Sequence, residues 1–153
     1  MTALELKVPP VVLVSIVAVG MWALSRIAPD LAIAIPAAGW LASGVALTGM
    51  AIAILGVSAF RKAGTTVDPR VPGQSESLVV SGVYRYSRNP MYLGFLLVLC
   101  AWGLWLGNLP ALLFLPAFVL YMNHFQIVPE ERFMWDKFGA AYATYCAEVR
   151  RWM

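Results

Sequence analysis

Two short clusters of polar and aromatic residues carry most of the chemistry that this sequence offers. The first reads GVYRYSRNPMYLG over residues 82–94, and the second, PEERFMWDKFGAAYATY over residues 129–145, opens with the adjacent carboxylates Glu130 and Glu131. Carboxylates bind an ammonium group, arginines bind a carboxylate, and aromatic rings stack on a base or face a cation. Together, the clusters predict a site for a zwitterionic ligand that contains an aromatic ring.

Each cluster taken alone also has a simpler structural interpretation. Tyrosines and arginines at the start of an apolar segment are typical of an anchor at the membrane interface, and two glutamates suit the positive end of a helix. His124, the one histidine of the chain, either caps an apolar helix or orients a substrate and accepts a proton. Cys100 and Cys146 lie in unrelated contexts, so neither a metal site nor a disulfide framework is predicted.

The composition places these clusters in a membrane protein. Hydrophobic residues make up 61% of the 153 residues and charged residues only 12%, about half the usual share of a soluble domain. The charges are also unevenly spread, and long stretches have none. The formal net charge of +3 is therefore interpreted as a signal of membrane topology and not of nucleic-acid binding.

Four segments are long and apolar enough to span a bilayer, which takes about 20 residues in a helix. They cover residues of about 8–27, 35–60, 91–107 and 111–128, with a polar loop at 61–90 between the second and the third. Residues 129–151 have both charge signs and helical spacing, with Gly139 as a possible break. We predict an all-α, single-domain bundle of about four transmembrane helices with an amphipathic C-terminal helix.

The distribution of basic residues predicts the orientation of this bundle. With four spans, the N-terminus, the 61–90 loop and the C-terminal segment lie on one side, and Arg26 is the only basic residue on the other. Basic loops stay in the cytoplasm, so both termini are predicted to be cytoplasmic, in a bacterial inner membrane. The third and fourth spans form a hairpin that brings the two clusters together at its cytoplasmic end.

The two clusters in this order resemble the isoprenylcysteine carboxyl methyltransferase and phospholipid methyltransferase superfamily of membrane enzymes. Matching segments are GVYRYSRNPMYLG, PEERFMWDKFGAAYATY and VRRW, and the resemblance runs from about Thr65 to the end. It implies S-adenosylmethionine as methyl donor, with one glutamate on the methionine ammonium. Asn89 stands where many members have a titratable histidine, and His124 and Gln126 stand where many have an arginine. The cofactor-binding residues that the resemblance implies are Tyr84, Arg88, Asn89, Pro90, Tyr92, Gly94, Glu130 and Glu131.

We therefore predict methyl transfer from S-adenosylmethionine to a lipophilic, lipidated or membrane-embedded acceptor, with catalytic roles for Glu131 and His124. Prenylcysteine carboxylate, phospholipid amine, isoprenoid and small thiol all remain open as acceptors. The alternative is a non-enzymatic membrane scaffold or partner subunit, for which Glu131→Gln would be harmless. A transporter is disfavoured because no charge lies within a span to mark a path.

Overall fold

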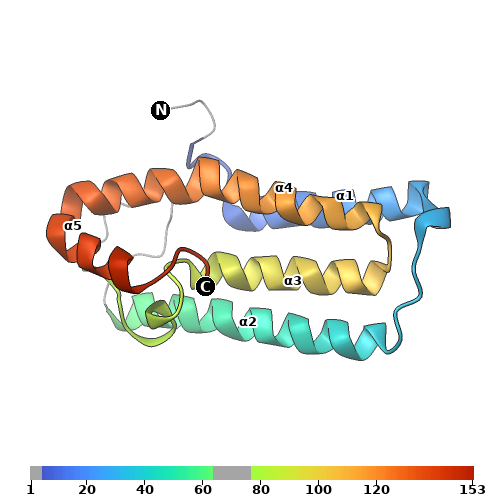
Figure 1. Cartoon of the computed structure of the whole chain (residues 1–153), viewed down its shortest axis with the longest axis horizontal. Coiled ribbons are helices and arrows are strands. Elements are labelled where there is room, and N and C mark those ends of the chain that lie inside the picture. Colours follow the sequence, from blue (N-terminus) through green and yellow to red (C-terminus); the bar gives the residue numbers. More distant parts are fainter. Residues whose placement is uncertain (1–4, 64–76) are drawn as a thin grey trace.

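Helices dominate the computed structural model, which describes residues 5–63 and 77–153 (Figure 1). The middle of the predicted 61–90 loop, including Arg70, lies outside these residues. The prediction of an all-α fold is confirmed, since the described residues contain helices and no named strand. The principal helices are α1 (Pro10–Ile27), α2 (Ala38–Lys62), α3 (Pro90–Leu106), α4 (Phe114–Tyr121) and α5 (Val128–Glu148), with short turns η1 (Pro29–Leu31), η3 (Gly82–Arg85), η4 (Pro110–Leu113) and η5 (Met122–Ile127).

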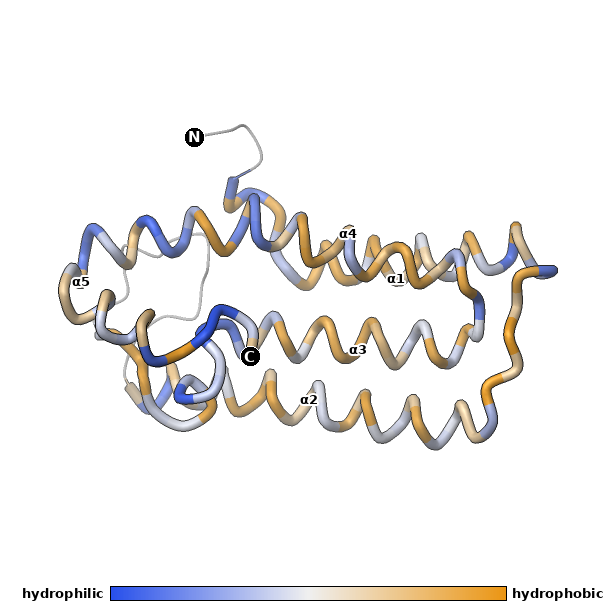
Figure 2. The backbone as a smooth tube through the Cα atoms, in the orientation of Figure 1, coloured by the Kyte–Doolittle hydropathy of each residue, from blue (hydrophilic) through white to orange (hydrophobic). Residues whose placement is uncertain are grey.

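Three of the described helical segments are long and apolar enough to cross a membrane. They are α1, α2 and the continuous helical stretch Pro110–Glu148 that contains α4 and α5. The fourth apolar helix, α3, has 17 residues, which is the lower limit of about 17 for a spanning helix. Figure 2 shows mainly hydrophobic helix shafts, with hydrophilic residues gathered at the end that holds α5 and the C-terminus. Any polar site must therefore lie at that end.

Helices α2 and α3 approach each other closely because glycines face each other between them. A Cβ atom added to Gly94 would lie 2.5 Å from the carbonyl oxygen of Gly49, and one added to Gly49 would lie 2.7 Å from that of Gly94. Small residues of this kind let helix backbones pack tightly in lipid. Gly94 thus serves helix packing, although the resemblance implied a place for it around the cofactor.

We expect Gly94→Ala to lower the apparent midpoint of thermal unfolding in detergent, because the added methyl group has no space. Overpacking of this kind costs about 1–3 kcal/mol. Gly44→Ala is the matched control, since a Cβ at Gly44 meets no atom within 4 Å. Equal midpoints for the two variants would show that the glycine contact does not hold α2 against α3.

The fourth span continues into the C-terminal helix without a break. Its last turns, η5, are π-helical, and α5 follows directly with Pro129 at its start. Proline has no N–H to donate to the carbonyl four residues earlier, which is that of Phe125. The backbone N–H of Leu6 donates to this oxygen at 3.0 Å instead. The N-terminal segment therefore satisfies the group that Pro129 leaves unpaired.

Helix α5 reverses direction and returns the end of the chain to α3. Gly139, where the sequence suggested a break, has φ 44° and ψ −117°, a conformation that glycine tolerates best. Beyond Glu148 the chain is no longer helical, and residues 149–153, here called the C-terminal strap, run to the start of α3 (Figure 1). Both clusters and the strap therefore meet at one end of the bundle.

Candidate functional site

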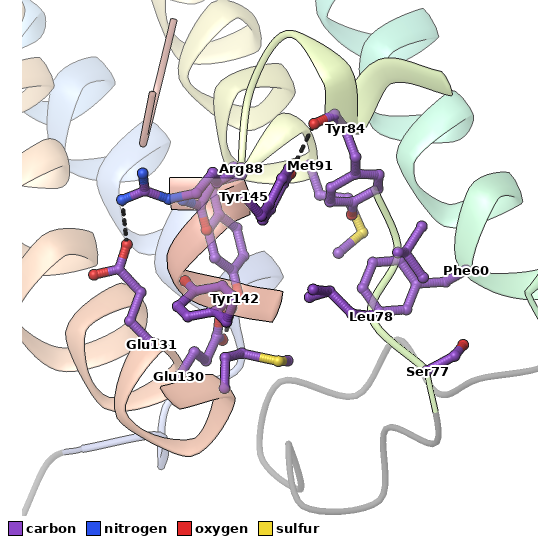
Figure 3. Close-up of a pocket in the computed structure, with 14 residues that line it drawn as sticks. Phe60, Ser77, Leu78, Tyr84, Arg88, Met91, Glu130, Glu131, Tyr142 and Tyr145 are labelled. Carbon is purple, nitrogen blue, oxygen red and sulfur yellow. Dashed lines mark hydrogen bonds and ion pairs between the residues drawn. The ribbon is translucent and has the colours of Figure 1, made fainter. Parts of the chain in front are cut away.

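A cavity of about 90 Å³ lies where α3, α5 and the η3 turn meet (Figure 3). Its volume corresponds to about three water molecules, which suits the polar end of a ligand. Its walls mix aromatic rings with three charged side chains, which come from α5 and from the residues just before α3 (Figure 3). The lining residues are Phe60, Ser77, Leu78, Val79, Tyr84, Arg88, Asn89, Met91, Tyr92, Glu130, Glu131, Met134, Tyr142 and Tyr145.

Glu130 is held in this cavity by two neutral hydrogen-bond donors. The Tyr92 hydroxyl donates to its Oε1 at 2.5 Å, and Gln126 Nε2 donates to the same oxygen at 2.8 Å. Gln126 and Tyr92 are themselves buried, so the carboxylate is rigidly placed. Among the described residues no hydrogen bond reaches Oε2. Glu130 therefore has one oxygen held by the protein and one available to a ligand.

Glu131, its neighbour, is instead enclosed by two arginines. Arg88 Nη2 donates to Oε1 at 2.9 Å. Arg151 donates twice, from Nε to Oε1 at 3.1 Å and from Nη2 to Oε2 at 2.6 Å, in the bidentate geometry that makes the strongest ion pairs. Both oxygens of Glu131 are thus engaged within the protein, and this carboxylate links α5, the residues before α3 and the C-terminal strap.

Within the described residues, Arg88 donates hydrogen bonds from both terminal nitrogens of its guanidinium but not from Nε. Its Nη1 donates to the carbonyl oxygen of Val149 at 2.7 Å, and its side chain is 14% exposed. Burial alone would lower the pKa of this guanidinium, but the hydrogen bond and charge of Glu131 raise the pKa above its ordinary value. The buried Nε has no hydrogen-bond partner among the described residues. A buried unpaired donor is costly, so this N–H fits an acceptor supplied by a ligand.

The C-terminal strap closes this side of the site through its backbone. Asn89 Nδ2 donates to the carbonyl oxygen of Arg151 at 3.0 Å, and the Arg88 N–H donates to that of Arg150 at 3.0 Å. Trp152 Nε1 donates to Asn123 Oδ1 at 3.1 Å. Asn89 thus uses its amide to bind the strap, a task that needs no titratable group.

Aromatic rings form the opposite wall of the cavity. Tyr84 is buried and packs edge to face on Phe60, with ring centroids 5.2 Å apart. The Tyr145 hydroxyl donates to the carbonyl oxygen of Tyr84 at 2.7 Å. Burial, followed by the charges of Tyr145 and Glu130, raises the pKa of the Tyr84 phenol far above its usual range, so this group stays neutral. The wall therefore presents neutral π faces to a cation.

The structure brings together six of the residues predicted for the site. Three others do not line the cavity: Pro90 starts α3, Gly94 packs on α2, and His124 is exposed and contacts the Phe125 ring at 4.6 Å between centroids. The six that line it are Tyr84, Arg88, Asn89, Tyr92, Glu130 and Glu131.

The sequence did not single out some side chains that complete the site. Gln126 could have been found, because it precedes Glu130 by four residues on a helix and so shares its face. Arg151 lies in the matching segment VRRW, but nothing in the sequence linked it to Glu131, since this contact spans 20 residues and depends on the reversal at Gly139. Tyr142 and Tyr145 lie in the second cluster, but the sequence analysis did not assign either of them to the site.

The arrangement is suited to binding a zwitterion next to an aromatic surface. Glu130 offers a carboxylate oxygen for an ammonium group, and the Arg88 Nε–H offers a donor for a carboxylate. The described residues contain no group of three or more His, Cys, Asp or Glu side chains that could hold a metal ion.

Two comparisons with known proteins give matches to parts of this chain. The family model described as phospholipid methyltransferase matches residues 37–141, about two thirds of the 153 residues. A protein of Haemophilus influenzae described as "Uncharacterized protein" is 51% identical over 63 residues, which is 41% of this chain and all of that protein. No solved structure gives a significant match. The C-terminal strap lies beyond the residues that the family model matches.

Proposed function

The chain belongs to the phospholipid methyltransferase family, and on this premise we propose that it transfers a methyl group from S-adenosylmethionine to a lipophilic acceptor in the membrane. The family suggests methyltransferase activity on membrane lipids, and the apolar helices make the chain an integral membrane protein. The use of this methyl donor is supported by two residues that line one aromatic cavity. Glu130 has one carboxylate oxygen that accepts hydrogen bonds and one that does not, and the buried Arg88 Nε has no partner among the described residues.

These two groups match the amino-acid end of the donor. The methyl donor supplies, when bound, an activated methyl group on a positively charged sulfur. Glu130 Oε2 binds the ammonium of its methionine part, and Arg88 Nε binds the carboxylate. Glu131 acts indirectly, by holding Arg88 and Arg151 in place. The structure thus favours Glu130 over Glu131 as the residue that touches the cofactor.

The remaining residues contribute position and environment. Tyr84, Tyr142 and Tyr145 present neutral rings that stabilise positive charge through cation–π contacts. The aromatic wall also limits the access of water, and exclusion of water together with positioning supplies much of the barrier reduction in a transfer of this kind. A carboxylate or thiolate acceptor needs no base, whereas an amine must lose a proton before it attacks.

The scaffold alternative has less support from the geometry. A scaffold needs no cavity, yet here donors and acceptors from α3, α5 and η3 converge on one. Buried polar groups are expensive unless they are satisfied, so an unpaired Arg88 Nε is easier to explain as part of a ligand site.

Binding of S-adenosylhomocysteine, measured by calorimetry in detergent, tests the proposal. We expect a saturable heat with one site per chain. No binding at millimolar ligand would reject the proposal. Incubating labelled S-adenosylmethionine with the protein and a membrane lipid extract would then identify the acceptor from the labelled product.

The predicted role of His124 in orienting the acceptor or taking its proton stays a prediction. Because its side chain is exposed and outside the cavity, we expect His124→Ala to leave the affinity for S-adenosylhomocysteine within about twofold. The predicted role concerns the acceptor, so the transfer rate tests it. A large fall in rate with unchanged affinity would establish this role, and an unchanged rate would reject it.

We also propose that both termini face the cytoplasm of a bacterial inner membrane, as the basic residues indicate. The site at the strap end would then meet the cofactor in the cytoplasm. Thiol labelling of cysteines introduced at Lys7 and at Arg26, in intact cells, tests this orientation. Labelling of the Arg26 position alone by an impermeant reagent is expected, and the reverse pattern would reject it.

A further inference from the structure

A second cavity, here called the η3 pocket, lies between the last turns of α2 and residues 81–86, which include the η3 turn. Its volume is about 640 Å³, within the range of about 300–1,000 Å³ that is usual for small-molecule sites. It shares no lining residue with the cavity that contains Glu130. The proposed methyl transfer therefore leaves this pocket without a role.

The η3 pocket lies at the end of a helix that is long and apolar enough to cross the membrane. α2 ends at Lys62, and Figure 1 shows the loop that contains η3 beside its last turns. Leu55, about two turns before the end of α2, lines the pocket and is 51% exposed. Tyr86 also lines it and is 80% exposed, and tyrosines are enriched at the level of lipid headgroups. The pocket is therefore placed where the hydrocarbon of a bilayer gives way to its headgroups.

The described residues that line the η3 pocket include two cations and no carboxylate. Lys62 is the last residue of α2, and Arg85 is the last residue of η3. Both side chains are exposed, and neither takes part in an ion pair within the described part of the chain. Like charges that line one cavity repel each other, and an anion bound between them offsets this repulsion.

The other polar groups of the η3 pocket also suit an anion. Ser81 and Tyr86 contribute hydroxyl groups, which can donate hydrogen bonds to an oxyanion. Ser58 instead donates to the carbonyl oxygen of Leu55 at 2.9 Å. A Cβ atom added to Gly82 would meet no atom within 4 Å, so the space beside this part of the backbone is open. Two cations, hydroxyl donors and open space together match a phosphate group.

We propose that the η3 pocket binds a phosphate group, which bridges Lys62 on α2 and Arg85 on η3. The position at the end of α2 favours the phosphate of an anionic membrane lipid, and free phosphate offers the same chemistry without lipid chains. The bridge holds η3 against α2, where Tyr84 packs on Phe60. The bound phosphate lies outside the cavity that contains Glu130, so the inference does not depend on the proposed methyl transfer.

Native mass spectrometry of the full chain in mild detergent tests this site without any need for turnover. The probe is 1-palmitoyl-2-oleoyl phosphatidylglycerol, which contains no amine to methylate, and diacylglycerol with the same chains is the phosphate-free comparison. We expect Lys62→Gln/Arg85→Gln to reduce retention of phosphatidylglycerol by about tenfold or more, because each cation near a membrane surface contributes about fivefold. Retention of diacylglycerol should not change.

Two further double variants are the controls for this measurement. Lys7→Gln/Arg26→Gln removes one lysine and one arginine that do not line the η3 pocket, and Lys62→Arg/Arg85→Lys keeps both charges within it. Both variants should retain phosphatidylglycerol within about twofold of the unmodified protein. If Lys7→Gln/Arg26→Gln loses as much lipid as Lys62→Gln/Arg85→Gln, net charge alone attracts the lipid and the proposed site is rejected.

Thermal unfolding in detergent distinguishes the two sources of phosphate and shows whether each variant is folded. A ligand that binds the folded state raises the apparent midpoint of unfolding. A rise with phosphatidylglycerol but not with millimolar inorganic phosphate, absent from Lys62→Gln/Arg85→Gln, identifies the lipid as the ligand, and the reverse pattern identifies free phosphate. No rise with either probe, together with undiminished lipid retention in Lys62→Gln/Arg85→Gln, would overturn the proposal.

Discussion

Glu130→Gln should weaken the binding of S-adenosylhomocysteine by about tenfold or more. The change removes the negative charge proposed to hold the ligand ammonium, and charge-assisted hydrogen bonds are worth about 1.5–3 kcal/mol, or about 10- to 150-fold in affinity. The fold should survive, because the amide oxygen of glutamine still accepts from Tyr92 and Gln126. Calorimetry in detergent measures the affinity.

The matched control for this variant is Glu148→Gln. It makes the same substitution on the same helix, at an exposed position, and should leave affinity unchanged. Thermal unfolding of both variants shows whether they are folded. A folded Glu130→Gln protein with the affinity of the unmodified protein would remove Glu130 from the cofactor site.

Glu131→Ala should act mainly on stability. It leaves Arg88 and Arg151 without their shared carboxylate, and losing one member of a buried ion pair costs about 3–5 kcal/mol. Arg88 and Glu131 side chains are 14% and 15% exposed, but Arg151 is 36% exposed, so we expect the lower part of this range. The apparent midpoint of thermal unfolding in detergent should fall by more than about 5 °C.

Glu148→Ala provides the comparison, since it removes an exposed glutamate from the same helix. The double variant Glu131→Ala/Arg151→Ala should recover part of the loss, because one unpaired cation is removed with its partner. A midpoint for Glu131→Ala equal to that of Glu148→Ala would show that the ion pairs do not hold the C-terminal strap. It would also agree with the scaffold alternative, in which changes at Glu131 are harmless.

Glu130→Gln and Glu131→Ala together distinguish a role in ligand binding from a role in stability, although the two residues are adjacent in one motif. Neighbouring positions on an α-helix point about 100° apart, so Glu130 and Glu131 face different surroundings. Loss of affinity without loss of stability in the first variant, and loss of stability in the second, would assign binding to Glu130 and positioning to Glu131.

Much of the architecture could be predicted because its signals are local. Long apolar segments without charge identify helices that can enter a bilayer, whatever they pack against. The turn between residues 106 and 110 joins two such segments, so the residues before α3 and after α4 must meet at one end. Six of the predicted site residues, Tyr84 and Glu130 among them, line the cavity there.

Local signals are ambiguous where a residue type can serve two purposes. Gly94 belongs to the motif that suggested cofactor binding, but its lack of a side chain serves the contact with Gly49. His124 is polar and near the site in sequence, yet its position on the helix turns it outward. In neither case does the residue type reveal which neighbour it faces.

The sequence by itself determined the apolar helices, the two clusters and their meeting at one end of the bundle, since these follow from hydropathy and chain connectivity. Only the tertiary structure decided which glutamate is bound by neutral donors and which by two arginines. That choice depends on the rotation of α5 after the π-helical η5, on the reversal at Gly139, and on Arg151 arriving from the C-terminal strap to engage Glu131. Such contacts join residues far apart in the chain, and no local pattern encodes them.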